Sequence, residues 1–170
     1  FHVLPRATSS ATYRLNESGA FDILEGKDAG AQLVYAGYDD ESELVGLAVE
    51  AQGMGYQDVI GLIYGYSFAE DAIIGIQVLE SKETPGLGDK IFKDMNFVEQ
   101  FFAGPETPLL GVKSGAGKGK PNEIDMITGA TISSKAVIGI INHALEEWKP
   151  VLDKGIPQAP ADIASGEGAQ

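Results

Sequence analysis

Apolar runs that alternate with short polar turns dominate the first half of the chain. Residues 44–49, 59–66 and 72–80 are rich in Val, Ile and Leu, and runs of this kind bounded by turn residues are typical of β-strands. The residues between them, 53–56 and 69–71, have turn-forming compositions. Because the three strands are neighbours joined by short connections, the pattern predicts an antiparallel meander.

Two weaker strand patterns precede the meander, at residues 21–24 and 32–36. Residues 1–10 show no clear period, so we expect a loose lead-in there. The end of the chain, residues 153–170, is largely Pro, Ala and Gly, which is typical of a tail that is flexible or only loosely docked. These boundaries predict one domain over residues 11–152.

The second half of the chain carries helical periodicity in two places. Apolar residues between positions 90 and 102 are close to helical spacing, which predicts one or two short helices. A longer apolar stripe predicts a helix over residues 133–149, which Pro150 is expected to end. That stripe consists of Val137, Ile140, Ile141, Ala144, Leu145 and Trp148. Residues 104–121 are expected to form a loop. The predicted fold class is α+β, an antiparallel sheet with a few helices packed on one side in a single compact domain.

Composition narrows the possible functions. The formal net charge of the 170 residues is −13 at pH 7, which argues against a nucleic-acid partner, whose phosphates would be repelled. The absence of cysteine excludes disulfides, Cys-ligated iron–sulfur clusters and a Cys nucleophile. No apolar run reaches the length of about eighteen residues that a transmembrane helix needs.

A hydroxyl-rich turn lies directly before the longer predicted helix. It contains Thr128, Thr131, Ser133 and Ser134. Ser and Thr at such a position are expected to cap the helix by accepting hydrogen bonds from its unpaired backbone N–H groups. The same N–H groups, at the positive end of the helix dipole, favour a phosphate, and Gly129 and Ala130 leave room for a ligand to approach. The local pattern therefore fits two interpretations: a phosphate site, or a well-capped helix that binds nothing.

Residues 125–135 read Asp-Met-Ile-Thr-Gly-Ala-Thr-Ile-Ser-Ser-Lys, a string that resembles the flavinylation motif of the FMN-binding domain family of RnfG and NqrC subunits, and RnfG more closely. Members of this family are subunits of membrane-bound, ion-translocating electron-transport complexes. The resemblance implies that Thr131 carries FMN through a phosphoester bond. It also implies that Thr128, Gly129, Ala130 and Ser133 contribute to the cofactor site. Asp125 is expected to help present Thr131 for modification, and the alternative is a simple turn-forming Asp.

A second stretch, Glu83-Thr84-Pro85-Gly86-Leu87-Gly88, resembles the family segment that lies against the flavin ring. The resemblance implies that Thr84, Leu87 and Gly88 lie along the isoalloxazine, with Glu83 nearby. The alternative is a plain strand-to-helix turn with a buried Leu87. The two motifs stand in the family's order, and the resemblance extends over roughly residues 51–148.

Two further features are compatible with a flavin without requiring one. Glycines interrupt the predicted strands, and they suit either the close approach of a flat ring or plain β-bulges. They are Gly46, Gly61, Gly65 and Gly75. Four aromatic side chains are candidates to stack on a flavin, although core or surface strand positions explain such residues more often. They are Tyr56, Tyr64, Tyr66 and Phe68. His143 is expected to be exposed, and no metal site is predicted.

The resemblance also implies how FMN is attached and where the protein resides. A threonine hydroxyl is a poor nucleophile without a base or a metal, and the only histidines are His2 and His143. In the family a separate Mg-dependent flavin transferase takes FMN from FAD, so this chain is expected to accept the modification without catalysing it. The implied partners are that transferase and the other membrane subunits of the complex. The implied location is the extracytoplasmic face of the cytoplasmic membrane, with an N-terminal anchoring helix that is absent from this chain.

The predicted function is electron relay by covalent FMN in an Rnf-type complex. We expect an electron-transfer subunit rather than a stand-alone catalyst, and no residue is assigned a catalytic role. Three alternatives remain open: an NqrC-like subunit, a flavin carrier for an extracytoplasmic reductase, and a cofactor-free binding or assembly domain.

Overall fold

The apolar runs of the first half of the chain form one antiparallel sheet. A computed structural model describes residues 2–24, 32–116 and 119–165. Six strands pair in the order β2-β1-β3-β4-β5-β6, and every pairing in this sheet is antiparallel. The strands are β1 (Ser9–Leu15), β2 (Phe21–Ile23), β3 (Leu33–Tyr38), β4 (Leu44–Met54), β5 (Val59–Ser67) and β6 (Ala72–Ser81). The predicted meander and the α+β class are confirmed.

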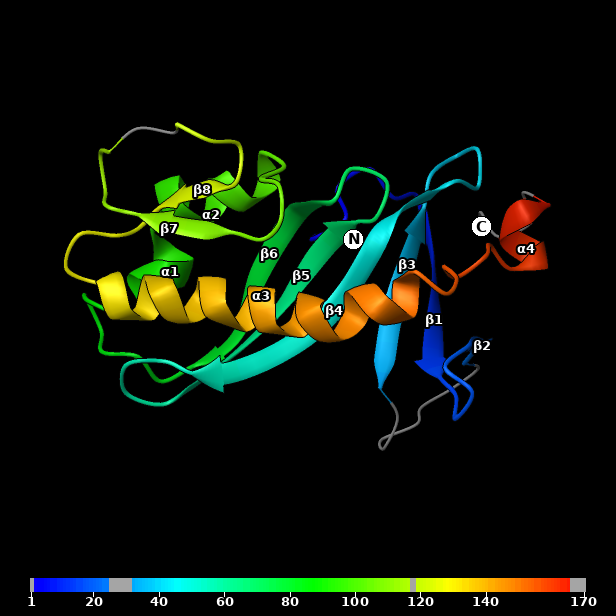
Figure 1. The fold of residues 1–170 in the computed structure, drawn as a ribbon, viewed down its shortest axis with the longest axis horizontal. Helices are drawn as coiled ribbons and strands as arrows, with labels where there is room; N and C mark the ends of the chain where they lie inside the picture. Colours follow the sequence, from blue (N-terminus) through cyan, green and yellow to red (C-terminus); the bar gives the residue numbers. More distant parts are fainter. Residues whose placement is uncertain (1, 25–31, 117–118, 166–170) are drawn as a thin grey trace.

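Helices and a small second sheet lie beside one face of this large sheet. Helix α3 crosses that face, and the other elements gather where α3 begins, except the last helix of the chain, which lies beyond the opposite end of α3 (Figure 1). The prediction of one or two short helices between positions 90 and 102 is confirmed, and the two helices are α1 and α2. The elements are α1 (Lys90–Lys93), α2 (Met95–Phe102), β7 (Leu110–Val112), β8 (Glu123–Asp125), α3 (Thr131–Leu152) and α4 (Ala161–Ala164). Strands β7 and β8 pair in parallel.

Helix α3 exists because one face of it is apolar and fully covered. Val137, Ile141, Leu145 and Trp148 recur at three- or four-residue spacing, and all four are buried. The helix does not end at Pro150, as the sequence predicts, but two residues later. Leu152 packs into the same core with 2% of its surface exposed. Burial of that side chain outweighs the helix-breaking effect of a proline in the last turn.

The N-terminal segment covers part of the opposite face of the sheet. Val3 and Leu4 are buried in a second apolar cluster with residues of β4 and β6. A Cβ added at Gly65 would lie 1.9 Å from the carbonyl oxygen of Val3, and one added at Gly75 would lie 2.6 Å from it. These glycines therefore make room for the chain's own N-terminal segment. The segment is packed, where the sequence analysis expects a loose lead-in.

Three other local expectations also differ from the structure. The turn expected at residues 53–56 begins later, because β4 continues through Met54. Strand β7 forms inside the expected loop 104–121, and Asp125 lies in strand β8 instead of a loop or turn. The last two corrections have one cause: two three-residue strands are too short to leave a period in the sequence, and only their mutual pairing defines them.

The last described residues, 153–165, are docked on the edge of the sheet. The Tyr13 hydroxyl donates to the carbonyl oxygen of Gln158 at 2.5 Å, and the Ser42 hydroxyl donates to that of Ile163 at 3.0 Å. The rest of the predicted tail, residues 166–170, lies outside the described residues. The boundaries at residues 11 and 152 stay a prediction.

Candidate functional site

The first turn of α3 is left without a side-chain cap. The residue at the N-cap position is Ala130, and no side chain bonds to the end of the helix, so the predicted capping by Ser and Thr is wrong. Among the described residues, the N–H groups of Thr131, Ile132 and Ser133 have no protein acceptor. Gly129, with φ +82°, turns the chain into the helix. The result is a 22-residue helix with an open N-terminus.

The serines that might have capped the helix lie inside it and are fully engaged elsewhere. The Ser134 hydroxyl donates to the Ala130 carbonyl at 2.9 Å and accepts from the Ile127 N–H at 3.1 Å. The Ser133 hydroxyl donates to Glu83 Oε2. Both serines are buried. They therefore fix the turn that presents Thr131, whereas Thr131 itself is exposed.

Glu83 joins the two motifs, which lie about fifty residues apart. Besides Ser133, it accepts a hydrogen bond at 2.9 Å from the backbone N–H of Gln57, in the β4–β5 hairpin. Burial alone would raise the pKa of the Glu83 carboxyl, but the hydrogen bonds from Gln57 and Ser133 outweigh it and hold the pKa below its ordinary value. Glu83 is therefore an ionised, buried bracket behind the site.

Between the two motifs lies a hollow of about 390 Å³. Seven of the residues predicted for the site line it: Thr84, Leu87, Gly88, Gly129, Ala130, Thr131 and Ser133. Tyr56 and Ile132 complete the wall. Three large apolar side chains of this wall are unusually exposed, Tyr56 at 65%, Leu87 at 51% and Ile132 at 56%. Leu87 is therefore not the buried residue of a plain turn.

The close packing behind the hollow depends on glycine. A Cβ at Gly88 would come within 2.6 Å of Glu83 Oε2 and 2.9 Å of the Ser133 hydroxyl oxygen. The hollow thus combines an exposed threonine hydroxyl, free backbone N–H groups and apolar side chains around a glycine-lined floor. A phosphate ester of a flat aromatic ring system needs these same features. The residues fit FMN.

Other predicted residues lie outside this hollow. Asp125 and Thr128 line a different recess of about 490 Å³, together with Lys90 and Gln100. The Gln100 side chain brackets the backbone of Asp125, accepting from its N–H at 2.8 Å and donating to its carbonyl at 3.1 Å. The structure thus separates these two motif residues from the Thr131 hollow. Their predicted roles stay predictions.

Of the aromatic candidates, only Tyr56 reaches the hollow. Tyr64 and Tyr66 are buried core residues and Phe68 does not line the hollow. Sequence reasoning missed Ile132 and Gln57. Ile132 carries a weak signal, since it is an apolar residue at a solvent-facing position of the first helical turn. Gln57 carries none, because its contact with Glu83 spans 26 residues.

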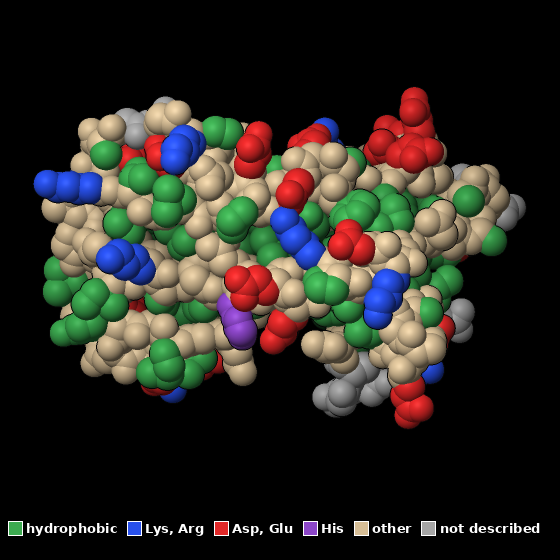
Figure 2. All heavy atoms as spheres, in the orientation of Figure 1, with side chains coloured by type: hydrophobic (Ala, Val, Ile, Leu, Met, Phe, Trp, Pro, Cys, Tyr) green, Lys and Arg blue, Asp and Glu red, His purple; other side chains and the backbone are tan. Residues whose placement is uncertain are grey.

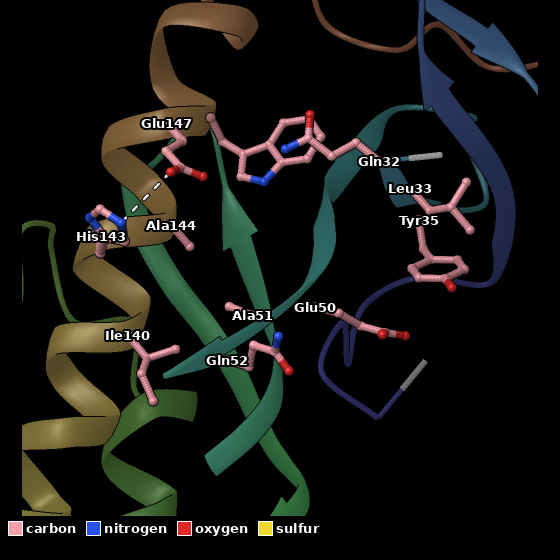
Figure 3. Close-up of a pocket in the computed structure, with 11 residues that line it drawn as sticks. Gln32, Leu33, Tyr35, Glu50, Ala51, Gln52, Ile140, His143, Ala144 and Glu147 are labelled. Atoms are coloured by element: carbon pink, nitrogen blue, oxygen red, sulfur yellow. Dashed lines mark ion pairs between the residues drawn. The ribbon is translucent and has the colours of Figure 1, made fainter. Parts of the chain in front are cut away.

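A larger and more polar hollow, of about 470 Å³, lies between α3 and strands β3 and β4 (Figure 3). His143 lies on its helix side, exposed as predicted, with Nε2 3.7 Å from a carboxylate oxygen of Glu147. None of the predicted cofactor residues lines it. Within the described part of the chain, no group of three or more acidic or His side chains is arranged to hold a metal ion.

Two curated relatives are similar to this chain in sequence. It is 36% identical over 114 residues to the G subunit of the ion-translocating oxidoreductase complex of Methanosarcina acetivorans, covering 67% of this chain and 57% of the relative. It is 37% identical over 117 residues to the G subunit of the Na(+)-translocating ferredoxin:NAD(+) oxidoreductase complex of Acetobacterium woodii, covering 68% and 55%. The chain spans a little more than half the length of these curated relatives.

Two solved structures share the fold. NqrC of Shewanella oneidensis aligns with a TM-score of 0.69 at 18% identity, covering 89% of this chain and 85% of that one. The C subunit of the Na(+)-translocating NADH-quinone reductase of Parabacteroides distasonis aligns with a TM-score of 0.63 at 22% identity, covering 86% and 78%. Residues 55–146, which include both motifs and Thr131, match the FMN-binding domain family. The resemblance to RnfG-type proteins is confirmed, and the chain belongs to the FMN-binding domain family.

Proposed function

We propose that this chain carries FMN on Thr131 through a phosphoester bond and relays electrons as part of an RnfG-type member of an ion-translocating oxidoreductase complex. The observation that carries the proposal is the open start of α3. Thr131 offers an exposed hydroxyl beside three unpaired N–H groups, at the positive end of a 22-residue helix dipole. A phosphate esterified to Thr131 would stabilise this end of the helix by accepting hydrogen bonds from those N–H groups.

The remaining residues of the hollow suit the ring of the cofactor. A ring bound in the hollow would cover apolar surface of Tyr56, Leu87 and Ile132 that is otherwise exposed to water. The Thr84 hydroxyl donates to Gln57 Oε1 at 2.8 Å, which fixes it at the rim. When bound, FMN supplies one- and two-electron chemistry, and the protein positions the ring and limits access to it.

The chain is the acceptor in its own modification. Attachment forms a bond between the Thr131 hydroxyl oxygen and the FMN phosphorus of FAD. It breaks the pyrophosphate bond, releases AMP and transfers the hydroxyl proton to a base. The residues that line the hollow include no His, Asp, Glu or Lys, and Glu83 is held behind it by its own hydrogen bonds. A separate flavin transferase supplies the base and the metal.

The wider role rests on the relatives. Those at 36% and 37% identity are named as the G subunits of their complexes, which favours an Rnf-type complex. The similarity to the NqrC structures supports the fold alone. A flavin carrier for an extracytoplasmic reductase would use the same hollow, whereas a cofactor-free assembly domain would leave the exposed apolar wall of the hollow unexplained.

We place the domain at the extracytoplasmic face of the membrane, attached to the other proteins of the complex. Among the helices of the described residues, none has both the length and the apolar character needed to cross a bilayer.

Intact mass after coexpression with a flavin transferase tests the attachment. The unmodified sequence is expected to gain the mass of one FMN less one water, and Thr131→Ala is expected to gain nothing. Thr84→Ala is the matched control, because it removes the other threonine hydroxyl of the same hollow and should still be modified. Modification of Thr131→Ala, or no gain in any variant with a transferase that is active on another substrate, would refute the proposal.

A further inference from the structure

Charge is distributed very unevenly along this chain. Residues 82–135, which contain both motifs, hold seven of the twelve Lys and Arg residues but only seven of the 25 acidic residues. That segment is formally neutral, so the rest of the chain carries the whole net charge of −13. Figure 2 shows basic and hydrophobic side chains at the end where α3 begins, and a mixture of acidic and basic side chains, with acidic ones prominent, over the middle and the other half of the molecule.

The carboxylates of the motif-bearing end are mostly committed to the fold. Asp89 is buried, accepts from the Gly86 N–H at 2.8 Å and pairs with Lys93 at 2.6 Å. Asp94 caps α2, and Glu123 accepts from the backbone of Gly119 at 2.7 Å. Their negative charge is therefore balanced locally by N–H groups and Lys93, whereas Glu99 and Glu106 of the same segment are exposed.

The lysines of the same end are not committed in this way. Lys90, Lys113 and Lys135 form no ion pair within 4.0 Å among the described residues. Lys135 follows Thr131 by four residues, so it lies on the same side of α3. Lys113 follows β7, next to Met126, whose N–H bonds to Val112 at 2.9 Å. Lys90 lines the recess that contains Thr128.

The three lysines thus lie on segments that flank the loop presenting Thr131: Lys90 in α1, Lys113 after β7 and Lys135 in α3. We propose that this lysine rim, Lys90, Lys113 and Lys135, is a docking face for an acidic surface on a partner protein. The charge argument does not depend on the proposed function. Only the purpose of the contact, which is to bring a redox partner to the Thr131 hollow, rests on that function. The acidic turn between β3 and β4 would be directed away from such a partner. It consists of Asp39, Asp40, Glu41 and Glu43.

A protein fits this face better than an anionic lipid surface does. The rim borders a recess of about 490 Å³ that is lined by Lys90 and also by two carboxylates, Asp94 and Asp125. A folded protein can place its carboxylates opposite the separate lysines and away from Asp94 and Asp125, whereas an anionic headgroup layer presents negative charge to all of them. The large negative charge of the remaining chain would also be repelled by an anionic membrane. Complementary charge at short range orients the encounter of two proteins.

Binding to a defined acidic probe, without flavin, tests the face. The probe is a synthetic deca-glutamate peptide, titrated into the ¹⁵N-labelled 170-residue chain at low ionic strength. Amide shifts are expected at Lys90, Lys113, Lys135 and the loop before Thr131, and they should diminish as salt screens the contact. A combined K90Q/K113Q/K135Q variant is expected to bind about tenfold more weakly, which is the scale of three exposed ion pairs.

Lys154 provides the matched control, because it is exposed and lies beyond the end of α3. K154Q is expected to change binding less than about twofold. Equal binding by the triple variant, or shifts confined to other surfaces, would overturn the proposal. So would binding to phosphatidylglycerol-containing vesicles without binding to the peptide, since that result favours a membrane. The assay uses unmodified protein, so its outcome is independent of whether Thr131 accepts FMN.

Discussion

Helices α2 and α3 begin at the same end of the molecule, but only one of them is capped (Figure 1). The carboxylate of Asp94 accepts from the Asn96 N–H at 3.1 Å at the start of α2, whereas Ala130 offers α3 nothing. Helix α2 has eight residues and α3 has 22. A long helix with a fully buried stripe is stabilised by packing and tolerates an open end, while a short one depends more on its cap. The open end is therefore available for a ligand.

The largest effect should come from breaking the Glu83 bracket behind the start of α3. Glu83→Ala leaves the buried Ser133 hydroxyl and the Gln57 N–H without their charged acceptor, so it should lower the free energy of unfolding by about 2–4 kcal/mol. Urea unfolding measures this. Glu83→Gln, which keeps the shape and one acceptor oxygen, should lose less. A loss below about 0.5 kcal/mol for Glu83→Ala would mean that the bracket does not hold the two motifs together.

Filling the space behind the open start should have the next largest effect. Gly88→Ala forces a Cβ against Glu83 and Ser133, and it should cost about 1–3 kcal/mol of stability and slow FMN attachment. Gly86→Ala is the matched control in the same loop. Gly86 has φ +77° and open space around it, so this variant should cost about 1–2 kcal/mol through backbone strain alone. Equal attachment rates for the two variants would contradict this role of Gly88.

Acid should weaken the Glu83 bracket, which is complete at neutral pH. The folded pKa of Glu83 lies below its ordinary value of 4.5. Its contribution is therefore complete above pH 4.5 and is lost as the pH falls through the folded pKa. Urea unfolding from about pH 7 down to about pH 3 should show a steeper loss for the natural sequence than for Glu83→Gln. Parallel profiles would show that Glu83 titrates as it does in the unfolded chain.

The smallest effects compare the two helix starts directly. Asp94→Ala removes a cap and should cost about 1 kcal/mol. Thr131→Ala removes a hydroxyl that is exposed, so it should change stability by less than about 0.5 kcal/mol while abolishing FMN attachment. Thermal unfolding and intact mass measure the two properties on the same samples. A large loss of stability in Thr131→Ala would mean that Thr131 serves the fold, and the contrast between the helix starts would fail.

Much of the fold follows from local patterns in the sequence. The runs that became β4, β5 and β6 are long, rich in β-branched residues and separated by short turns, so each identifies itself without its neighbours. The stripe from Val137 to Trp148 predicts α3 for the same reason. The segment around Thr131 and the segment from Glu83 to Gly88 identify the family. Each is continuous in the sequence, so its residue types can be recognised without the tertiary structure.

Contacts between distant segments decided the rest. Strands β7 and β8 exist only as a pair, and Leu152 extends α3 past Pro150 only because a core receives it. Val3 and Leu4 are fixed by glycines that lie more than thirty residues away in the sequence. The bond between Ser133 and Glu83, which turns two motifs into one site, is also a long-range contact. The sequence by itself therefore determined the elements and the Thr131 motif, while the tertiary structure decided which groups are engaged and which are left free. Hydrogen bonding and burial depend on neighbours in space, and a local pattern cannot specify those neighbours.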